Sequence, residues 1–232
     1  MTMYALVNIY NDRMFLGAML ESLIDNVDHI IVADGAYRLY YEHFLQFDPD
    51  AKPYSSDGSL EMIKHFRDLP ELTMITNGGE LWENQIIKRT KLVEAVPDGD
   101  EFLIIDADEM LSGDFQEGVE DWYDSGCVCC SFPLYHPGTE VERVTPHWHP
   151  RLFKKLPGMH YRGTHWHLRD RYGRIIEEKY PVHWTGVMQI IHMKPFKTKA
   201  RLIPHANYMN ELGQQGWLEP TDLGKVLMKT PP

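Results

Sequence analysis

The chain has 232 residues, a mass of 27.1 kDa and a net charge of -11. This length and an apolar content of 43% suffice for one large α/β domain or for a domain with an appendage. No run of about 18 uncharged apolar residues occurs, which argues against a membrane-spanning helix. The strongly acidic total disfavours nucleic-acid binding as the main function.

The charge is unevenly distributed along the chain. Residues 1–142 hold 8 Lys and Arg against 28 Asp and Glu, a balance of -20, whereas residues 143–201 hold 13 against 3, a balance of +10. An acidic half that collects a cation and a basic half that attracts phosphate suit a substrate whose phosphates are bridged by a metal.

Residues 1–10 contain no basic leader and no small-residue cleavage site, so we expect no signal peptide. Three cysteines, Cys127, Cys129 and Cys130, lie too close together to form a disulfide framework. Their segment is typical of a buried strand, with a metal site shared with nearby histidines as the alternative. We therefore expect a cytoplasmic protein.

Two short strands flank a helix near the start of the chain. Residues 4–10 are rich in β-formers, residues 14–24 repeat apolar side chains at helical spacing, and residues 29–33 form a second apolar run. This order predicts a βαβ unit with parallel strands. Because ligands of such sheets bind beyond the carboxyl ends of the strands, we expect Asn11 and Asp34 at a binding edge.

The aromatic stretch from 36 to 54 is predicted to fold over this edge, either as a platform for an acceptor or as a packed surface loop. Residues 55–59 predict the cap of a short helix, residues 72–76 a third strand, and residues 83–96 a second amphipathic helix. The cations of this last helix are ordinary solvent-facing charges in one interpretation. In the other, Arg89 reaches the binding edge.

Residues 102–105 are apolar and predict a strand buried on both faces, which ends in Asp106, Asp108 and Glu109. Carboxylates two residues apart repel one another unless a cation or hydrogen-bond donors neutralise them. Magnesium and manganese prefer oxygen ligands, and magnesium completes its shell with water and phosphates. We interpret Asp-x-Asp as a metal-diphosphate site; the alternative is that the acids cap a helix starting near Leu111.

The second half predicts strands at residues 127–135 and 151–154 and a strand or loop at 159–168. Eight of the twelve histidines lie between residues 136 and 192, where they either complete a metal site or form structural hydrogen bonds. Four cations between 194 and 201 introduce a final helix. Residues 213–232 are expected to be a flexible tail.

The order of these motifs resembles that of family 2 glycosyltransferases of the GT-A fold, especially the small bacterial and phage members. The resemblance covers about residues 3–210 and is carried by Asn11–Asp12, Asp34–Gly35, Ser56–Ser59, Ile105–Glu109, Arg151–Phe153, Tyr161–His165 and Ile190–His192. It implies an α/β, Rossmann-type, mostly parallel sheet flanked by helices, with a smaller mixed acceptor-side region. One departure is that the aromatic insertion separates Asp34–Gly35 from the serines that follow them in the family.

The resemblance also implies an activity, namely transfer of a hexose from a UDP-, GDP- or dTDP-linked donor with Mn²⁺ or Mg²⁺ and inversion at the anomeric carbon. The implied donor contacts are Asn11, Asp12, Asp34, Gly35, Asp57, Arg89, Asp106 and Lys194. The implied metal ligands are Asp106, Asp108, His165 and His167, with His192 as a weaker candidate. The base that deprotonates the acceptor is Glu109, Asp170 or Glu177, and the sequence does not choose among them.

Residues 1–112 are expected to bind the donor, and residues 113–212 to complete the metal site and bind the acceptor within the same domain. A glycan, a protein or a modified nucleic acid is the expected acceptor. A sugar-nucleotide nucleotidyltransferase is one alternative, although residues 11–14 are not the Gly-rich basic loop that it requires. A carbohydrate-binding module is another; it would use the tryptophans and tyrosines and ignore the acids.

Overall fold

The computed structural model describes residues 1–66, 70–137 and 147–214, without the side chains of residues 147, 164–166, 213 and 214. Its strands are β1 (Met3–Ile9), β2 (His29–Asp34), β3 (Glu71–Ile75), β4 (Glu101–Asp106), β5 (Glu109–Gly113), β6 (Cys129–Tyr135), β7 (His147–Lys154), β8 (His160–Arg162), β9 (Thr164–Arg169), β10 (Val182–Trp184) and β11 (Met188–His192). Its helices are α1 (Arg13–Leu23), α2 (Arg38–Phe44), α3 (Ser59–His65), α4 (Gln85–Glu94), α5 (Phe115–Ser125), α6 (Ile176–Lys179), the 3₁₀ turn η2 (Lys194–Phe196) and α7 (Lys199–Gln214).

A curled, mostly parallel sheet runs through the molecule in the order β3-β2-β1-β4-β7-β6-β11-β5, with β10 paired to β6. The predicted βαβ unit is confirmed, because β1 and β2 pair in parallel from Tyr4↔His29 to Ile9↔Asp34. β4 lies on the other side of β1, also in parallel. β7 then runs antiparallel between β4 and β6 and so joins the acidic and basic parts of the chain in one sheet.

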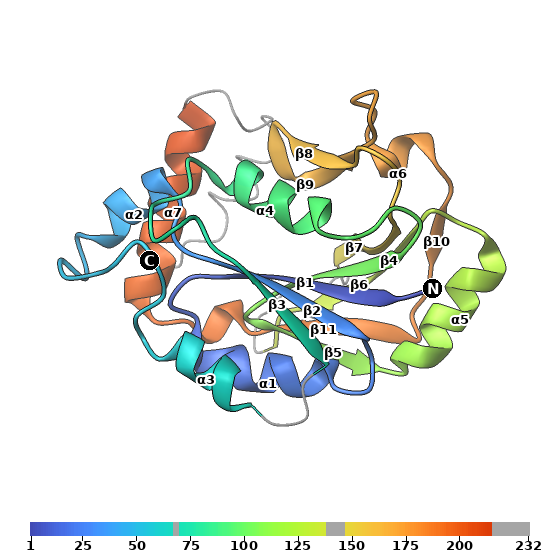
Figure 1. The fold of residues 1–232 in the computed structure, drawn as a ribbon, viewed down its shortest axis with the longest axis horizontal. Coiled ribbons are helices and arrows are strands. Elements are labelled where there is room, and N and C mark those ends of the chain that lie inside the picture. Colours follow the sequence, from blue (N-terminus) through green and yellow to red (C-terminus); the bar gives the residue numbers. More distant parts are fainter. Residues whose placement is uncertain (67–69, 138–146, 215–232) are drawn as a thin grey trace.

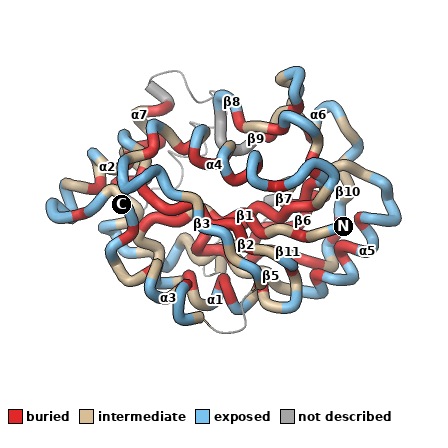
Figure 2. The backbone as a smooth tube through the Cα atoms, viewed as in Figure 1, coloured by how far each residue is buried: buried red, intermediate tan, exposed pale blue. Residues whose placement is uncertain are grey.

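Helices cover both faces of this sheet (Figure 1). One apolar cluster packs α1 and α5 against one face, through side chains that include Leu16, Leu20 and Trp122. A second cluster packs α4 and the β8-β9 hairpin against the other face, through Leu92, Phe102 and others. Figure 2 shows the result, since the buried parts of the chain follow the strands and the inward sides of the helices.

The local sequence explains where the helices start and face. In α1, the buried residues Leu16, Met19, Leu20 and Leu23 recur at the three- and four-residue spacing of one helix face. Helix α5 starts at Asp114, whose side chain accepts a hydrogen bond from Glu117 N–H, and ends at a left-handed glycine.

The aromatic stretch from 36 to 54 is a packed element and not an open platform. It forms α2, and its side chains pack against α7 in a third apolar cluster that includes Tyr10, Tyr40, Phe44 and Tyr208. Tyr40 and Tyr208, for example, meet edge to face with their ring centroids 6.2 Å apart. The packed-loop interpretation is therefore confirmed.

Residues 109–113 form a strand where the alternative interpretation placed a helix. β5 pairs with β11 in antiparallel register, from His192↔Glu109 to Met188↔Gly113. The acids at 106, 108 and 109 therefore lie on a tight turn between two strands and do not cap a helix. Position 113 has a φ of +81°, and a Cβ there would lie 2.3 Å from the carbonyl of Val187, so the close approach requires glycine.

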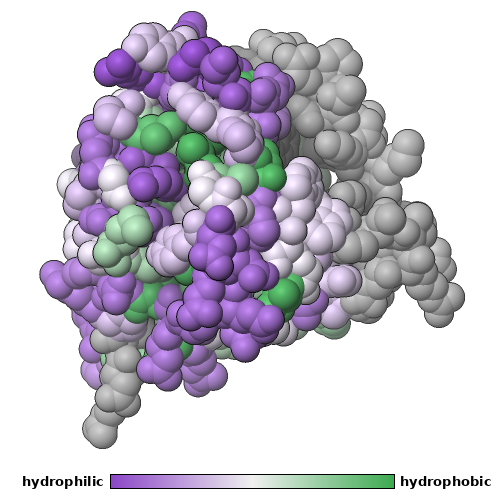
Figure 3. All heavy atoms as spheres, turned by 90° about the vertical axis from the view of Figure 1, so that its right-hand side faces the viewer, coloured by the Kyte–Doolittle hydropathy of each residue, from purple (hydrophilic) through white to green (hydrophobic). Residues whose placement is uncertain are grey.

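Two observations describe the outer surface. No helix in the described part of the chain is long and apolar enough to cross a membrane. Figure 3 shows the end of the sheet at which β1 begins, where hydrophilic side chains predominate and hydrophobic ones are scattered. Scattered apolar side chains of this kind are normal on a protein surface.

Candidate active site

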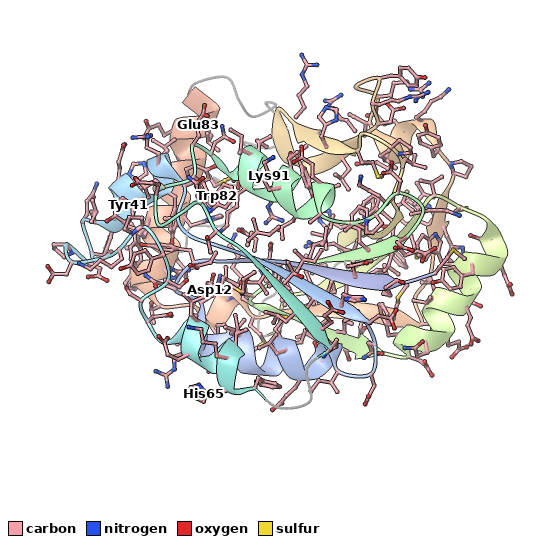
Figure 4. All side chains as sticks on the ribbon, viewed as in Figure 1. Asp12, Tyr41, His65, Trp82, Glu83 and Lys91 are labelled. Carbon is pink, nitrogen blue, oxygen red and sulfur yellow. The ribbon has the colours of Figure 1, made fainter. Side chains whose placement is uncertain are left out.

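The parallel strands β1, β2, β3 and β4 end at the same edge of the sheet, beside α2 and α7 (Figure 1). The chain leaves β1 for β2 on one side, whereas β4 lies on the other side of β1. Ligands of open α/β sheets bind in the crevice at such a switch point, beyond the carboxyl ends of the strands. Asp12, labelled in Figure 4, and Asp106 follow or end the two strands that flank this point.

The acidic turn after β4 is held by two arginines. Arg89 of α4 donates to Asp106 Oδ1 at 2.7 Å. Glu109 is fully buried, and its two carboxylate oxygens accept hydrogen bonds from Asp106 N–H at 2.8 Å and from Arg151 at 2.6 Å. Burial opposes ionisation of Asp106, but Arg89 and Arg151 outweigh it and lower its pKa to about 2. These contacts fix the turn.

Asp108 lies between a histidine and a lysine from the C-terminal part of the chain. Its Oδ2 is 3.0 Å from His192 Nε2 and 3.0 Å from Lys197 Nζ. Its backbone carbonyl accepts a hydrogen bond from Met193 N–H at 2.7 Å. Burial raises the pKa of this carboxyl, but Lys197 and His192 outweigh burial and hold the pKa well below its usual value. Asp108 is therefore ionised in the neutral range.

Asp12 connects the end of β1 to the same C-terminal segment. Arg201 donates to Asp12 Oδ1 at 2.7 Å and to the carbonyl of Tyr10 at 2.6 Å. Lys197 Nζ lies 3.7 Å from Asp12 Oδ1, so one ammonium group faces both Asp12 and Asp108. The turns after β1 and β4 are thereby bridged by side chains that lie far from both in sequence.

The aromatic insertion separates Asp34 from Ser55 in the sequence, but the corner between β1 and β2 brings the two residues together. Ser55, which follows the aromatic insertion, donates from its hydroxyl to Asp34 Oδ1 at 2.5 Å and from its N–H to the same carboxylate. Its hydroxyl oxygen accepts from Asn11 N–H at 2.8 Å. Asn11 has a φ of +51°, and its Oδ1 accepts from Ser56 N–H. The insertion therefore loops out, and Ser55 returns to Asp34.

Acids and bases alternate along this edge. Three carboxylates (Asp12, Asp106 and Asp108) are each paired with at least one cation (Arg89, Lys197 or Arg201), so the group is close to neutral overall. Carboxylates suit a hard cation, and guanidinium and ammonium groups suit phosphate oxygens. The edge thus holds both kinds of group needed for a metal-bound diphosphate.

The residues suit a divalent cation only if the substrate supplies other ligands. Among the described residues, no three His, Cys, Asp or Glu side chains form a group that could hold a metal by themselves. Asp106 and Asp108 are hard oxygen donors at one turn, and the buried Nδ1 of His192 beside them has no hydrogen-bond partner within the described part. One or two carboxylates with substrate phosphates and water is the usual magnesium arrangement, so the donor set fits that ion.

Other predicted residues lie in different surroundings. His167 contacts Glu177, and the side chain of His165 lies outside the described residues. Asp170 accepts hydrogen bonds from the N–H groups of Tyr172 and Arg174 and from the Arg174 guanidinium, so it holds the loop after β9. These contacts do not support Asp170 as the base, nor does the complete burial of Glu109 support that residue.

Two more predicted donor contacts, Asp57 and Lys194, lie near the acidic group. Asp57 accepts hydrogen bonds from Arg13 N–H at 3.0 Å and from Ser59, and so joins the starts of α1 and α3. Lys194 lies in η2, near His205. Burial and Lys194 both lower the pKa of His205. Their roles as donor contacts stay predictions.

Sequence reasoning missed the two cations that complete the site. Lys197 and Arg201 were assigned to the start of a helix, with no role at the acids. The positive balance of residues 143–201 was the available signal, but it did not indicate which cations fold back. Helix α4 buries Leu92 and Val93 as expected, and Arg89 reaches the binding edge as the second interpretation predicted, but Lys88 is buried too and Ile87 is 36% exposed. Both cations have partners inside the protein, because Lys88 donates to backbone carbonyls and Arg89 donates to Asp106.

Comparison with known proteins gives a fold but no family. No protein-family model and no curated protein matches the chain. A crystal structure of S. aureus TarS, a GT-A glycosyltransferase, matches with a TM-score of 0.60 and 10% sequence identity over 91% of this chain. The fold is GT-A-like. The expected fold class is thus confirmed, and membership of family 2 stays a prediction.

Two further structural matches are more distant. S. aureus TarS 1–349 in complex with UDP matches over 63% of this chain with 15% identity and a TM-score of 0.47. The bifunctional IspDF from Campylobacter jejuni matches over 80% with 10% identity and a TM-score of 0.40. The chain spans about 40% of the TarS chain that it matches at a TM-score of 0.60, and 38% and 50% of these two.

Proposed function

We propose that this protein transfers a sugar from a nucleoside-diphosphate donor to an acceptor hydroxyl with the help of Mn²⁺ or Mg²⁺. The observation that supports it most is the alternation of Asp12, Asp106 and Asp108 with Arg89, Lys197 and Arg201 at the carboxyl edge of a GT-A-like sheet. Ion pairs that only stabilise the fold could lie anywhere on the surface. These lie at the switch point of the strands, where ligands of such sheets bind.

The charge balance of the site suits this donor. A divalent cation bound to the diphosphate of a nucleotide-sugar is close to neutral overall but strongly dipolar. It can exchange for the internal ion pairs without leaving a buried charge uncompensated, since carboxylates turn to the metal and cations to the phosphates. Lys197 Nζ, which faces both Asp108 and Asp12, is suited to such an exchange.

In this proposal Asp106 and Asp108 hold the cation, which supplies Lewis-acid stabilisation of the leaving diphosphate. The chain's own cations share that task. Arg89, Lys197 and Arg201 are positioned before the reaction, so they stabilise the charge that develops as the anomeric C–O bond breaks. Glu109 keeps Asp106 in place because it accepts from the Asp106 N–H, and Arg151 in turn donates to Glu109.

The acceptor must lose a proton to a base within hydrogen-bond reach. Of the three predicted acids, Glu177 is the one with a buried carboxylate oxygen, Oε2, that has no hydrogen-bond partner in the described part of the chain. Its other oxygen contacts His167, which orients the carboxylate. Glu177 lies near Cys129, however, at the end of the sheet opposite to the acidic turn, so we do not assign the base to any of the three acids.

The test measures release of nucleoside diphosphate from UDP-, GDP- and dTDP-linked hexoses, with Mn²⁺, with Mg²⁺ and with EDTA. We expect one donor class to be turned over only with a metal, and Asp108→Asn to lose that turnover. Lys199→Met is the matched control, because Lys199 is exposed in α7 near the site. Absence of donor turnover and of nucleotide binding under all conditions would contradict the proposal.

The same assay separates the alternatives. A nucleotidyltransferase would release inorganic diphosphate from a nucleoside triphosphate and a sugar phosphate, and not a nucleoside diphosphate from a nucleotide-sugar. A carbohydrate-binding module would bind sugars and ignore both metal and nucleotide.

A further inference from the structure

A lysine lies inside the protein directly beneath the candidate site. Lys88, in the second turn of α4, is 1% exposed. Lysine is almost never fully buried without a partner, so the ammonium group needs a structural explanation. Its Nζ donates to the carbonyl of Ile9 at 2.7 Å and to the carbonyl of Gly35 at 2.6 Å. These carbonyls belong to the ends of two neighbouring strands.

The two strands separate at this point. The parallel ladder of β1 and β2 ends at Ile9↔Asp34. Beyond it, the segment after β1 turns towards Asp12. The segment after β2 passes through Gly35, with a φ of +112°, into the aromatic insertion. The Lys88 ammonium lies in the fork and supplies a bridge where the ladder no longer does. It therefore links the turn that carries Asp12 to the turn that carries Asp34.

The bridge also carries a variable charge at the donor edge. The charged groups that face Lys88 are Asp34 of β2, Asp12 after β1, Arg89 of α4 and Asp106 of β4. Burial lowers the pKa of Lys88 to about 7, against the attraction of Asp34 and Asp12. A neutral amine still has two N–H groups, so both carbonyls keep their donor when the proton leaves.

We propose that Lys88 is a positioning residue of the donor site, which joins the ends of β1 and β2 and so fixes the spacing between the Asp12 and Asp34 turns. The ammonium of Lys88 donates to backbone carbonyls, so it acts on the donor through these two turns. The assignment to donor binding rests on the proposed function. The bridge itself does not, so the two ideas can be tested separately.

The first test needs no activity. The carbonyls of Ile9 and Gly35 share their peptide groups with the amide nitrogens of Tyr10 and Ala36. The ¹⁵N chemical shifts of these two amides therefore report on the charge of Lys88. Between about pH 6 and 9 we expect both shifts in the wild type to titrate with one midpoint near 7. Lys88→Met should abolish this step, and Lys91→Met should keep it, because Lys91 is exposed on the outer side of α4 (Figure 4). A step that appears at only one of the two amides, or that persists in Lys88→Met, overturns the bridge.

The second test is kinetic. Supporting groups behind a binding site typically contribute roughly 10- to 100-fold to affinity or activity. We expect Lys88→Met to raise KM for the donor by about tenfold or more, with a much smaller change in kcat, and Lys91→Met to change neither. An unchanged KM in folded Lys88→Met overturns the positioning role.

A second variant covers the case in which Lys88→Met does not fold. Lys88→Gln keeps an NH₂ group with two donors on a shorter, uncharged side chain. We expect it to fold and to show an intermediate KM, because part of the bridge is restored. A KM equal to that of the wild type, in a variant whose Tyr10 and Ala36 ¹⁵N shifts show that the two carbonyls have lost their donor, would overturn the positioning role. If the wild type turns over no donor while the ¹⁵N titration holds, the proposed function fails and the bridge stands.

Discussion

The ammonium nitrogen of Lys197 lies 3.0 Å from Oδ2 of Asp108. Lys197 belongs to the segment between β11 and α7, whereas Asp108 lies on the turn between β4 and β5. The acid that the sequence indicated most clearly is thus completed by a residue from the far end of the chain. This relationship makes the C-terminal segment part of the candidate site.

Lys197→Met should therefore separate binding of the metal from stabilisation of the leaving group. Without the ammonium, Asp108 is more available to a cation, so the affinity for Mn²⁺ should rise. Loss of one preorganised positive group should reduce kcat by about 10²- to 10³-fold. Calorimetry of Mn²⁺ binding and donor turnover check the two effects, with Lys199→Met as control. Unchanged kcat would remove Lys197 from the reaction.

Asp106→Asn should disable turnover and reduce stability. The side chain of Arg89, 10% exposed, would lose its charged partner at 2.7 Å. We expect transfer to fall by about 10²-fold or more and the free energy of unfolding to fall by about 1–3 kcal/mol. Donor turnover and urea unfolding measure these changes. Glu94→Gln, at the exposed ion pair with Lys91, is the control and should change neither by much.

The buried lysine gives stability a defined pH dependence. Folded Lys88 loses its proton near pH 7, whereas unfolded lysine keeps it to about 10.4. Between these values the unfolded chain binds more protons, so the unfolding free energy of the wild type should rise with pH relative to Lys88→Met, by at most about 1.4 kcal/mol per pH unit. Urea unfolding at several pH values measures it. A difference that is flat or falls with pH would contradict the shifted titration.

Asp170→Asn tests the assignment of this acid to structure. Its carboxylate holds the loop after β9 through Tyr172, Arg174 and Tyr180. We expect a lower Tm and donor turnover close to that of the wild type. Thermal unfolding and the nucleotide-release assay measure the two. An unchanged Tm together with loss of transfer would instead identify Asp170 as the base.

The parts of the fold that the sequence predicted are those with short-range patterns. Leu16, Leu20 and Leu23 gave α1 its face, and the apolar run from Phe102 to Ile105 gave β4 and hence the position of the acids. Residues 109–113 were missed as a strand because only pairing with β11, far along the chain, makes them one.

The acids of the site and Arg89 were predicted from the sequence, but Lys197 and Arg201 were not. Asp106 and Asp108 stand out because acids follow a buried strand. His192, the weaker metal candidate, is the histidine that contacts Asp108, whereas His167 contacts Glu177. No local pattern specifies which of several cations or histidines a tertiary fold brings to a given carboxylate, so these contacts required the structure.

Binding of Mn²⁺ together with a nucleoside diphosphate tests the central claim most directly. Electron paramagnetic resonance of free Mn²⁺, titrated with protein in the presence of UDP, GDP or dTDP, measures the bound fraction. We expect the wild type to bind Mn²⁺ with one of these nucleotides and Asp108→Asn to weaken this binding by about tenfold or more. Equal binding by the wild type and Asp108→Asn, or no binding with any of the three nucleotides, would contradict it.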